Sequence, residues 1–468
     1  MENEPKLERT LGLGQAVTLN LLDMIGVGPF ITLPLLLAAM GGPQAMMGWV
    51  LGAALAVCDG MVWAELGAAM PEAGGTYVYL REMFGGGFGR LLSFLFLFQL
   101  CFSAPLSVAS GCIGLSQYAT YLWPQLGHGG VTHMLHVGSH SAGIVAGPTT
   151  LVAIAAVVVA VVLLYRNLGK LKWISVALLC VVMGTIAWVV LTGVLKGNWA
   201  NVVEFPPGAF TLGRPFWLGL GAAMLVATYD YWGYYNVMFL GGEAKDAAKT
   251  IPRAVLLSIG IVFVLYLLLN ASVLAVMGSP MLLSATDVGA RRAVLAVMME
   301  MAWGSSGAGK IAAVLVMVTA FASVFSLLAG YSRIPYAAAR DGNFFRLFGK
   351  LHPTKRFPHV SLLILAGAGC LCCFFSLGEV IAALVVLRIV LQFGLQHVGV
   401  MVWRIRKPEA ARPFRMWLYP APPLLALAGF AYVAVERPHA GQQVMLAAVV
   451  AVVGCGVFFL RRAVKGSC

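Results

Sequence analysis

Three acidic residues inside apolar segments are the first candidates for chemistry in this sequence. Asp23, Asp59 and Asp230 each interrupt a long run of apolar side chains. A charge at the centre of a lipid bilayer costs at least ~2.5–3.5 kcal/mol on insertion scales, so such groups usually face a protein interior or a water-filled cavity. We therefore expect these acids to bind a cationic group or a proton, or to pair with a buried partner such as Arg388.

Two of these acids stand beside residues that break helices. Residues 21–37 read LLDMIGVGPFITLPLLL, with Gly26, Gly28 and Pro29 soon after Asp23. Residues 225–243 read LVATYDYWGYYNVMFLGGE, with Asp230 among five aromatic residues and next to a glycine at 233. Proline removes a backbone donor and clashes with the preceding turn, while glycine permits non-helical angles. Both segments are therefore predicted to be interrupted helices.

A helix broken at membrane depth exposes backbone groups that need partners. The N-terminus of the following half-helix attracts an anion, and the freed carbonyls attract a cation. An amino acid offers both groups, as its α-carboxylate and its α-ammonium. For the first segment alone, a simple proline kink is an equally good interpretation. The second break, with an acid beside it, favours a binding site.

The elements that carry these residues are predicted to be transmembrane helices. Of the 468 residues, 60% are hydrophobic and 10% are charged, whereas a soluble domain carries about 25% charged residues. A spanning helix needs roughly 20 mostly apolar residues, and no segment alternates as a membrane barrel strand does. Twelve segments satisfy the helical requirement, at about residues 14–39, 44–70, 88–123, 143–165, 171–195, 215–240, 253–277, 310–338, 359–376, 379–403, 417–436 and 441–461. An all-α membrane protein is expected.

The distribution of lysine and arginine predicts the orientation. With the N-terminus inside, 24 of the 31 basic residues fall in inner loops or tails and 6 in outer loops, while Arg388 lies within a span. Cytoplasmic loops carry such an excess, so both termini are predicted to be cytoplasmic and the membrane to be the inner one. The same bias explains the net charge of +13 without a nucleic-acid partner. Residues 1–10 are polar and unlike a cleaved signal, so the first apolar segment is expected to be retained.

Motifs for a metal, a cofactor or an enzyme are weak. The nine cysteines form no set of two CxxC pairs, and the four histidines between residues 124 and 142 are interpreted as part of a solvated outer loop, with a metal site as the less favoured alternative. The sequence has neither a GxSxG nucleophile motif nor a phosphate-binding Walker A loop. We expect no metal, no cofactor and no enzymatic activity, and we disfavour an ATP-driven pump. A sensor or an assembly subunit that uses a transporter fold is left open as an alternative.

Five short motifs occur in order over about residues 12–420. They are Gly26-Val27-Gly28-Pro29-Phe30; Ala64-Glu65-Leu66 with Pro71-Glu72-Ala73-Gly74-Gly75-Thr76-Tyr77; Gly242-Glu243 with Ile251-Pro252-Arg253-Ala254; Ser332-Arg333 with Ala339-Arg340-Asp341-Gly342; and RIRKPEAARPFR at 404–415. This ordered set resembles the amino acid/polyamine/organocation superfamily of permeases. The last motif and the Tyr-Trp pair at 231–232 are similar to the branch that includes polyamine-uptake and light-chain-type permeases.

The resemblance implies the leucine-transporter fold. For this chain we therefore expect 12 transmembrane helices. Ten of them form two inverted halves of five, and helices 1 and 6 are broken. The expected domains are a cytoplasmic tail over 1–13, a transporter core over 14–403 with halves at about 14–195 and 215–403, two peripheral helices over 404–463, and a cytoplasmic tail over 464–468.

The resemblance also implies where a substrate binds. Amides of the first break should hold a carboxylate, carbonyls of both breaks should hold an ammonium, and an aromatic of the second break should close over the side chain. Carried over by position, the predicted substrate-binding residues are Ile25, Gly26, Val27, Gly28, Ala227, Thr228, Tyr229, Asp230, Tyr231, Trp232 and Gly233.

Two departures from the family pattern concern binding and coupling. Val27 stands where a serine is common, so one hydroxyl contact is lost. Several relatives carry a lysine in span 5 that substitutes for sodium, but the matching position here is near Val182. Possible coupling residues are therefore Asp23, Asp230 and Ser323, the last matching a polar position beside that site.

The predicted function is secondary active transport of amino acids by alternating access. The partners expected are the amino acid, the surrounding lipid and a proton as coupling ion. The intramembrane acids favour a cationic or broad substrate. The alternatives left open are a polyamine transporter, and an amino acid exchanger without ion coupling. Glu65 and Glu243, near the inner membrane face, are expected to pair with loop arginines.

Overall fold

The structure, a computed structural model, describes residues 9–137, 140–166, 171–284, 293–355, 357–436 and 440–466. Seven of its helices are long and apolar enough to cross a membrane. They are α3 (Met47–Ala69, preceded by the short η2, Pro43–Met46), α5 (Gly86–Leu122), α6 (Pro148–Arg166), α7 (Leu171–Lys196), α11 (Ala247–Leu283), α14 (Ser306–Tyr331, followed by α15, Arg333–Arg340) and α20 (Ala440–Gly466). The helical membrane protein expected from composition is confirmed.

Shorter apolar helices accompany these seven. They are α13 (Val294–Trp303), α16 (His359–Cys372) and α19 (Ala421–Val435). The second and third coincide with predicted spans, whereas α13 lies in a predicted outer loop. With only ten residues it is too short to cross a bilayer, which is why its apolar sequence gave no span signal. The count of twelve spans stays a prediction.

The two predicted breaks are present. The first apolar segment consists of α1 (Leu13–Met24), a short 3-10 turn η1 (Gly28–Phe30) and α2 (Leu33–Met40). The other consists of α9 (Arg214–Tyr231) and α10 (Asn236–Phe239), with extended backbone at Trp232 between them. A third interruption was not predicted: α17 (Leu377–Arg388) and α18 (Leu395–Arg406) are joined by the π-helical segment η7 (Ile389–Gly394).

The predicted outer loop at 124–142 contains more structure than expected. After η3 (Pro124–Gly127), strands β1 (Val131–Val137) and β2 (His140–Ala146) form an antiparallel hairpin in which Val131 pairs with Ala146. The prediction that the fourth span begins at residue 143 is therefore wrong, since α6 begins at Pro148. Val145 donates to the Phe374 carbonyl (2.6 Å), which holds the hairpin against the chain between α16 and α17. Three of the four histidines considered for a metal site, at 133, 136 and 140, have side chains outside those that the structure describes.

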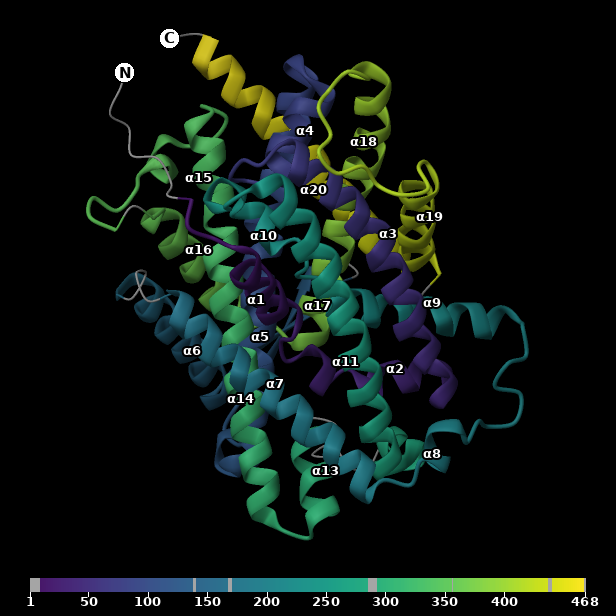
Figure 1. Ribbon diagram of the computed structural model, residues 1–468. Coiled ribbons are helices and arrows are strands. Elements are labelled where there is room, and N and C mark those ends of the chain that lie inside the picture. Colours follow the sequence, from purple (N-terminus) through teal and green to yellow (C-terminus); the bar gives the residue numbers. More distant parts are fainter. Residues whose placement is uncertain are drawn as a thin grey trace.

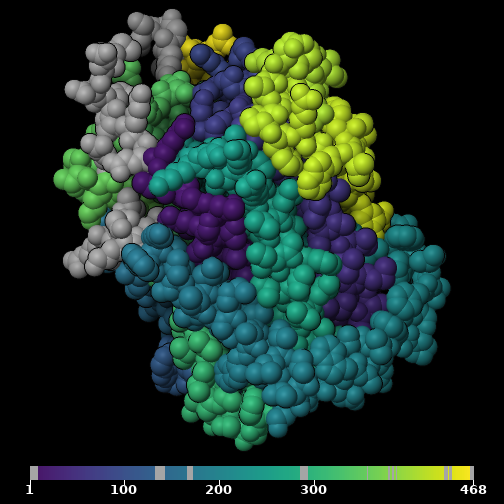
Figure 2. Space-filling model, viewed as in Figure 1, coloured from purple at the N-terminus to yellow at the C-terminus, as the bar shows by residue number. Residues whose placement is uncertain are grey.

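The helices form one bundle with the broken helices inside it (Figure 1). The start of α1 and the C-terminal end of α20 lie at the same end of the bundle, together with α4 (Thr76–Phe84) and α15. The short helix α8 (Ala200–Val203) and α13 lie at the opposite end. On the face shown in Figure 2, side chains of α11 (teal) pack between those of α1 and α3, so they fill the gaps seen between the ribbons.

Candidate functional site

The two helix breaks touch each other at the centre of the bundle. Gly233 has φ +129°, which L side chains rarely adopt, and a Cβ there would lie 2.6 Å from the Met24 amide nitrogen. Only glycine allows this approach of two main chains. The Tyr266 hydroxyl of α11 donates to the Met24 carbonyl (2.5 Å) and lies 3.1 Å from the Asp230 carbonyl. Tyr266 thereby satisfies carbonyls that the breaks leave without helical partners.

The first break leaves two amides free. Gly26 N–H donates to the Met24 carbonyl (3.0 Å), and Phe30 N–H donates to the Val27 carbonyl (3.1 Å). In the described chain, the amides of Val27 and Gly28 have no hydrogen-bond acceptor. Unpaired amides at the start of a helical segment attract an anionic group.

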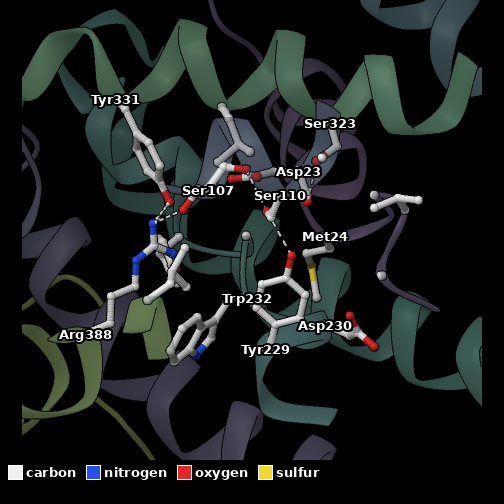
Figure 3. A pocket seen from close by; sticks show the side chains of 18 residues that line it. Asp23, Met24, Ser107, Ser110, Tyr229, Asp230, Trp232, Ser323, Tyr331 and Arg388 are labelled. Carbon is white, nitrogen blue, oxygen red and sulfur yellow. Dashed lines mark hydrogen bonds between the residues drawn. The ribbon is translucent and has the colours of Figure 1, made fainter. Parts of the chain in front are cut away.

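A cavity lies where the breaks meet, and its volume is about 50 Å³. One water molecule needs at least ~10–15 Å³ of such space, so the cavity holds a few waters and is narrow in this conformation. It is lined by Asp23, Met24, Gly26, Val27, Gly28, Ser107, Ser110, Gly111, Tyr229, Asp230, Trp232, Gly233, Tyr235, Ser323, Leu327, Tyr331, Leu384 and Arg388. Figure 3 places Arg388 and Asp230 on opposite sides of it, with Tyr229 and Ser110 between them.

Two carboxylates face the cavity. Asp230, in the last turn of α9, accepts a hydrogen bond from the Thr32 hydroxyl on Oδ2 (2.5 Å), and its Oδ1 has no partner among the described residues. Asp23 Oδ2 likewise has no partner there. Its main-chain carbonyl accepts a hydrogen bond from the Ser323 hydroxyl of α14 (3.3 Å). Asp23 therefore faces the cavity, and among the described residues no ion pair joins it to Arg388.

Arg388 is the cationic group of the cavity, and the sequence analysis did not include it in the binding site. It is 3% exposed and donates to the hydroxyls of Tyr235 (2.9 Å), Ser107 (2.6 Å) and Tyr331 (2.7 Å). Its guanidinium also lies 5.5 Å from the centre of the Trp232 ring. The signal that could have found it was present, because it is the basic residue that lies near the middle of a predicted span, whereas the others lie near span ends or outside the spans. Gln392 and Gln396, which follow Arg388 at helical spacing, are buried as well.

Most of the predicted residues meet at this cavity. Of the predicted binding and coupling residues, those that line it are Asp23, Gly26, Val27, Gly28, Tyr229, Asp230, Trp232, Gly233 and Ser323. Those that do not line it are Ile25, Ala227, Thr228 and Tyr231. The last four are near it in sequence, but Ala227 and Tyr231 pack towards Gly52 of α3. The roles suggested for all of these residues stay predictions.

Hydroxyl groups from neighbouring helices complete the lining. Ser107 and Ser110 come from α5, and Tyr331 ends α14. The Tyr229 hydroxyl donates to Ser110 Oγ (3.0 Å), which ties α9 to α5 across the cavity. The sequence signal for the serines was their spacing of three residues in an apolar helix, which places them on one face.

The other intramembrane charges are paired away from the cavity. Glu65 accepts hydrogen bonds from Arg404 (2.8 Å from Nε to Oε1), and Glu243 accepts one from Arg333 (3.0 Å). Both glutamates were expected to pair with loop arginines; they do contact arginines, but Arg404 lies in the last turn of α18 and Arg333 in the first turn of α15. Asp59 also lies outside the cavity, in contact with Tyr234 and His397.

The cavity has the groups to bind a zwitterion. It offers free amides and a guanidinium to a carboxylate, and two carboxylates to an ammonium. Among the described residues that line it there is no histidine or cysteine, and the Ser107 and Ser110 hydroxyls donate to carbonyls of their own helix. The lining therefore shows no nucleophile paired with a base.

Comparison with known proteins agrees with this arrangement. A protein-family profile described as amino acid permease matches residues 11–458. An uncharacterized transporter of Mycobacterium tuberculosis is 29% identical over 465 residues, which cover 97% of this chain and 90% of the relative. The serine/threonine exchanger of Bacillus subtilis is 24% identical (91% and 90% covered), and the human Asc-type amino acid transporter 1 is 25% identical (88% and 74% covered). The chain belongs to the amino acid permease family.

Proposed function

We propose that this protein transports amino acids by alternating access, with the cavity between the two breaks as the substrate site. The observation that carries the proposal is the position of free amides and unpaired carboxylate oxygens around one buried cavity. An amino acid pairs with both sets at once. Two relatives, a serine/threonine exchanger and an Asc-type amino acid transporter, support this class of substrate.

The proposed architecture is the leucine-transporter type with 12 spans. Its core covers residues 14–403, with halves at 14–195 and 215–403, and two peripheral helices cover 404–463. Interruption of the first and sixth apolar segments, at corresponding places in the halves, supports an inverted repeat. The protein is placed in the inner membrane with both tails, 1–13 and 464–468, in the cytoplasm. This orientation rests on the excess of lysine and arginine in the predicted inner loops.

In this proposal each substrate group has a partner. The Val27 and Gly28 amides hold the α-carboxylate, and Asp23 together with the main-chain carbonyl of Tyr229 holds the α-ammonium. The carbonyls of Ile25, Ala227 and Thr228, expected from the family resemblance, belong to residues that do not line the cavity. Tyr229 and Trp232 cover the side chain. Because the cavity is narrow, these aromatics move when a substrate enters.

The charge of the cavity favours a small zwitterionic amino acid. The expectation of a cationic or broad substrate depends on Asp23 and Asp230, but Arg388 adds a buried positive charge to the same lining. That charge repels a cationic side chain on its side of the cavity. A polyamine has no carboxylate, so it would leave the free amides and Arg388 without a partner. We therefore place serine-sized substrates first, cationic amino acids second and polyamines third.

Exchange of one amino acid for another is the second candidate mechanism. Val182 is apolar and fully buried in α7. Near the matching position, several relatives carry a lysine that substitutes for a sodium ion. A relative of this chain is named an exchanger. Both observations favour obligatory exchange unless another group binds a coupling proton.

Thermal stabilisation of the purified protein tests the substrate class. The twenty amino acids and common polyamines are compared in one detergent at one pH. Ligand at a hundredfold excess over its dissociation constant stabilises by ~2.7 kcal/mol. We expect serine-sized amino acids to raise the melting temperature most. Stabilisation by putrescine or spermidine, with none by any amino acid, would overturn the proposal.

A further inference from the structure

A second group of titratable side chains lies outside the cavity. Asp59 of α3 and His397 of α18 are both 0% exposed, and Asp59 Oδ1 lies 3.1 Å from His397 Nε2. Within the part of the chain that the structure describes, neither atom has a hydrogen-bond partner other than the opposite member of this pair. Buried polar atoms are normally paired, so a carboxylate oxygen and an imidazole nitrogen that have only each other at this distance mark a place where a proton binds between them.

The surrounding hydrogen bonds determine where that proton lies. Trp63 Nε1–H donates to Asp59 Oδ2 (3.0 Å), and the Tyr234 hydroxyl donates to the same oxygen. Since Oδ2 already accepts two hydrogen bonds, a proton on Asp59 lies on Oδ1. His397 Nδ1 is 2.6 Å from the Phe393 carbonyl, which can only accept, so Nδ1 carries a hydrogen. The position left for one more proton is between Oδ1 and Nε2.

This proton changes the charge of the pair by one. Without it, a carboxylate faces a neutral imidazole and the pair carries one negative charge. With it, the pair is neutral overall, either as carboxylate and imidazolium or as carboxylic acid and imidazole. An uncompensated charge in a buried site is costly, whereas imidazole readily exchanges a proton near neutral pH. The geometry thus suits a group that binds and releases one proton.

Among the residues that the structure describes, few other titratable groups lie near the pair. They are Cys58 on α3, Tyr79 on α4, Tyr234 and Tyr235 in the second break, and, farther along, Glu65 with its partner Arg404. From α19, the Phe430 ring lies 5.8 Å from the His397 ring, and from α11, Ile259 approaches Gly60 beside Asp59. The proton therefore decides the local charge.

Two chains of contacts join the pair to the cavity. Tyr234 follows Gly233 directly, and the next residue, Tyr235, accepts a hydrogen bond from Arg388 (2.9 Å). Phe393, whose carbonyl accepts from His397, packs on the Trp232 ring with centroids 5.0 Å apart. A change of charge at the pair therefore acts on both the second break and the π-helical segment η7.

We propose that Asp59 and His397 together bind the proton that drives accumulation of the amino acid. This inference rests on the proposed transport function, and it differs from the expectation that Asp23 or Asp230 takes the proton. One proton enters with one amino acid from the outer side, occupies the space between Oδ1 and Nε2, and leaves on the inner side with the substrate.

The test uses the purified full chain in proteoliposomes with the membrane potential clamped and no sodium. Counterflow of labelled amino acid into preloaded vesicles at equal pH measures exchange. Accumulation in empty vesicles under a gradient of two pH units measures coupling, with a limit of about 100-fold for one proton per substrate. The variant Asp59→Asn/His397→Gln keeps size and polarity but removes both titratable groups.

We expect the double variant to retain counterflow within about threefold of the wild type and to lose the accumulation. The control is Thr76→Val/Gln396→Met. It removes a buried pair (2.7 Å) that also joins α18 to a neighbouring helix but does not titrate. The control should still accumulate substrate. Gradient-driven accumulation in the Asp59/His397 variant would overturn the inference, and so would a wild-type protein that shows counterflow but no accumulation under the pH gradient. Absence of wild-type counterflow would instead count against the proposed function.

A second measurement needs neither transport nor a variant. Nitrogen-15 resonances of histidine are followed from pH 5 to pH 9 in the wild-type protein. His397 is recognised by slow hydrogen exchange, because it is the fully buried histidine among those whose side chains are described. Its Nδ1 should remain protonated throughout while its Nε2 signal shifts with pH. An Nε2 signal that stays constant over this range would refute proton binding at the pair.

Discussion

Alanine at position 233 should separate the two helix breaks and weaken substrate binding without disturbing the rest of the bundle. Gly233 has φ +129° and sits against the backbone of Asp23 and Met24. Strain of this kind costs ~1–3 kcal/mol. The new Cβ would lie 2.6 Å from Met24 N and 2.8 Å from Asp23 C. Both are main-chain atoms that cannot rotate away, and overpacking adds ~1–3 kcal/mol.

The two contributions together oppose contact of the breaks by about 2–6 kcal/mol. If the site forms only when the breaks touch, the lower value already weakens apparent affinity about 30-fold, at 1.4 kcal/mol per factor of ten. The assay is substrate-induced thermal stabilisation over a range of concentrations. Gly304→Ala is the matched control, since Gly304 also has positive φ (+62°) but no atom within 4 Å of its Cβ position. Affinity within threefold of wild type in Gly233→Ala would refute the reasoning.

Three further predictions follow from other contacts. A Gly28→Leu substitution directs a branched side chain at the Asp230 carboxylate. We expect a folded protein, monodisperse by size exclusion, that no amino acid stabilises. Normal uptake with unchanged apparent affinity would contradict this. Asp230→Asn should weaken all substrates alike, by about tenfold, because the carboxylate joins the two breaks and a charge-assisted hydrogen bond contributes ~1.5–3 kcal/mol; a selective loss of cationic substrates would show that it binds their side chains. Glu243→Gln should lower the free energy of unfolding by ~3 kcal/mol, because it breaks the buried pair with Arg333. Lys249→Gln, at the exposed ion pair with Asp246, should change the free energy of unfolding by less than ~1 kcal/mol. Equal shifts in melting temperature for the two variants would reject this distinction.

The helix breaks could be predicted because their causes are local. Pro29 and the adjacent glycines remove donors and permit unusual angles within a few residues, and Gly233 does the same in the other segment. A conspicuous acid, Asp230, marked the second break as functional. The family resemblance then assigned roles to residues on either side of each break, and most of those residues line one cavity.

The residues that other helices contribute to the cavity could not be predicted as easily, because they come from distant segments of the chain. Arg388 meets Ser107 and Tyr331 only after α5, α14 and α17 pack together. The pairing of Asp59 with His397 joins residues more than 300 positions apart. His397 carries no local signal, since a lone histidine in an apolar helix is common, and η7 has no proline or paired glycines to announce it.

Counterflow of labelled L-serine in proteoliposomes tests the central claim most directly, namely that one cavity between two breaks binds both ends of an amino acid for transport. Competitors are unlabelled L-serine, 3-hydroxypropanoate, which lacks the amine, and ethanolamine, which lacks the carboxylate. We expect entry of labelled serine that unlabelled serine blocks and that neither partial analogue blocks at the same concentration. Equal block by either analogue, or no counterflow of serine or any other amino acid, would contradict it.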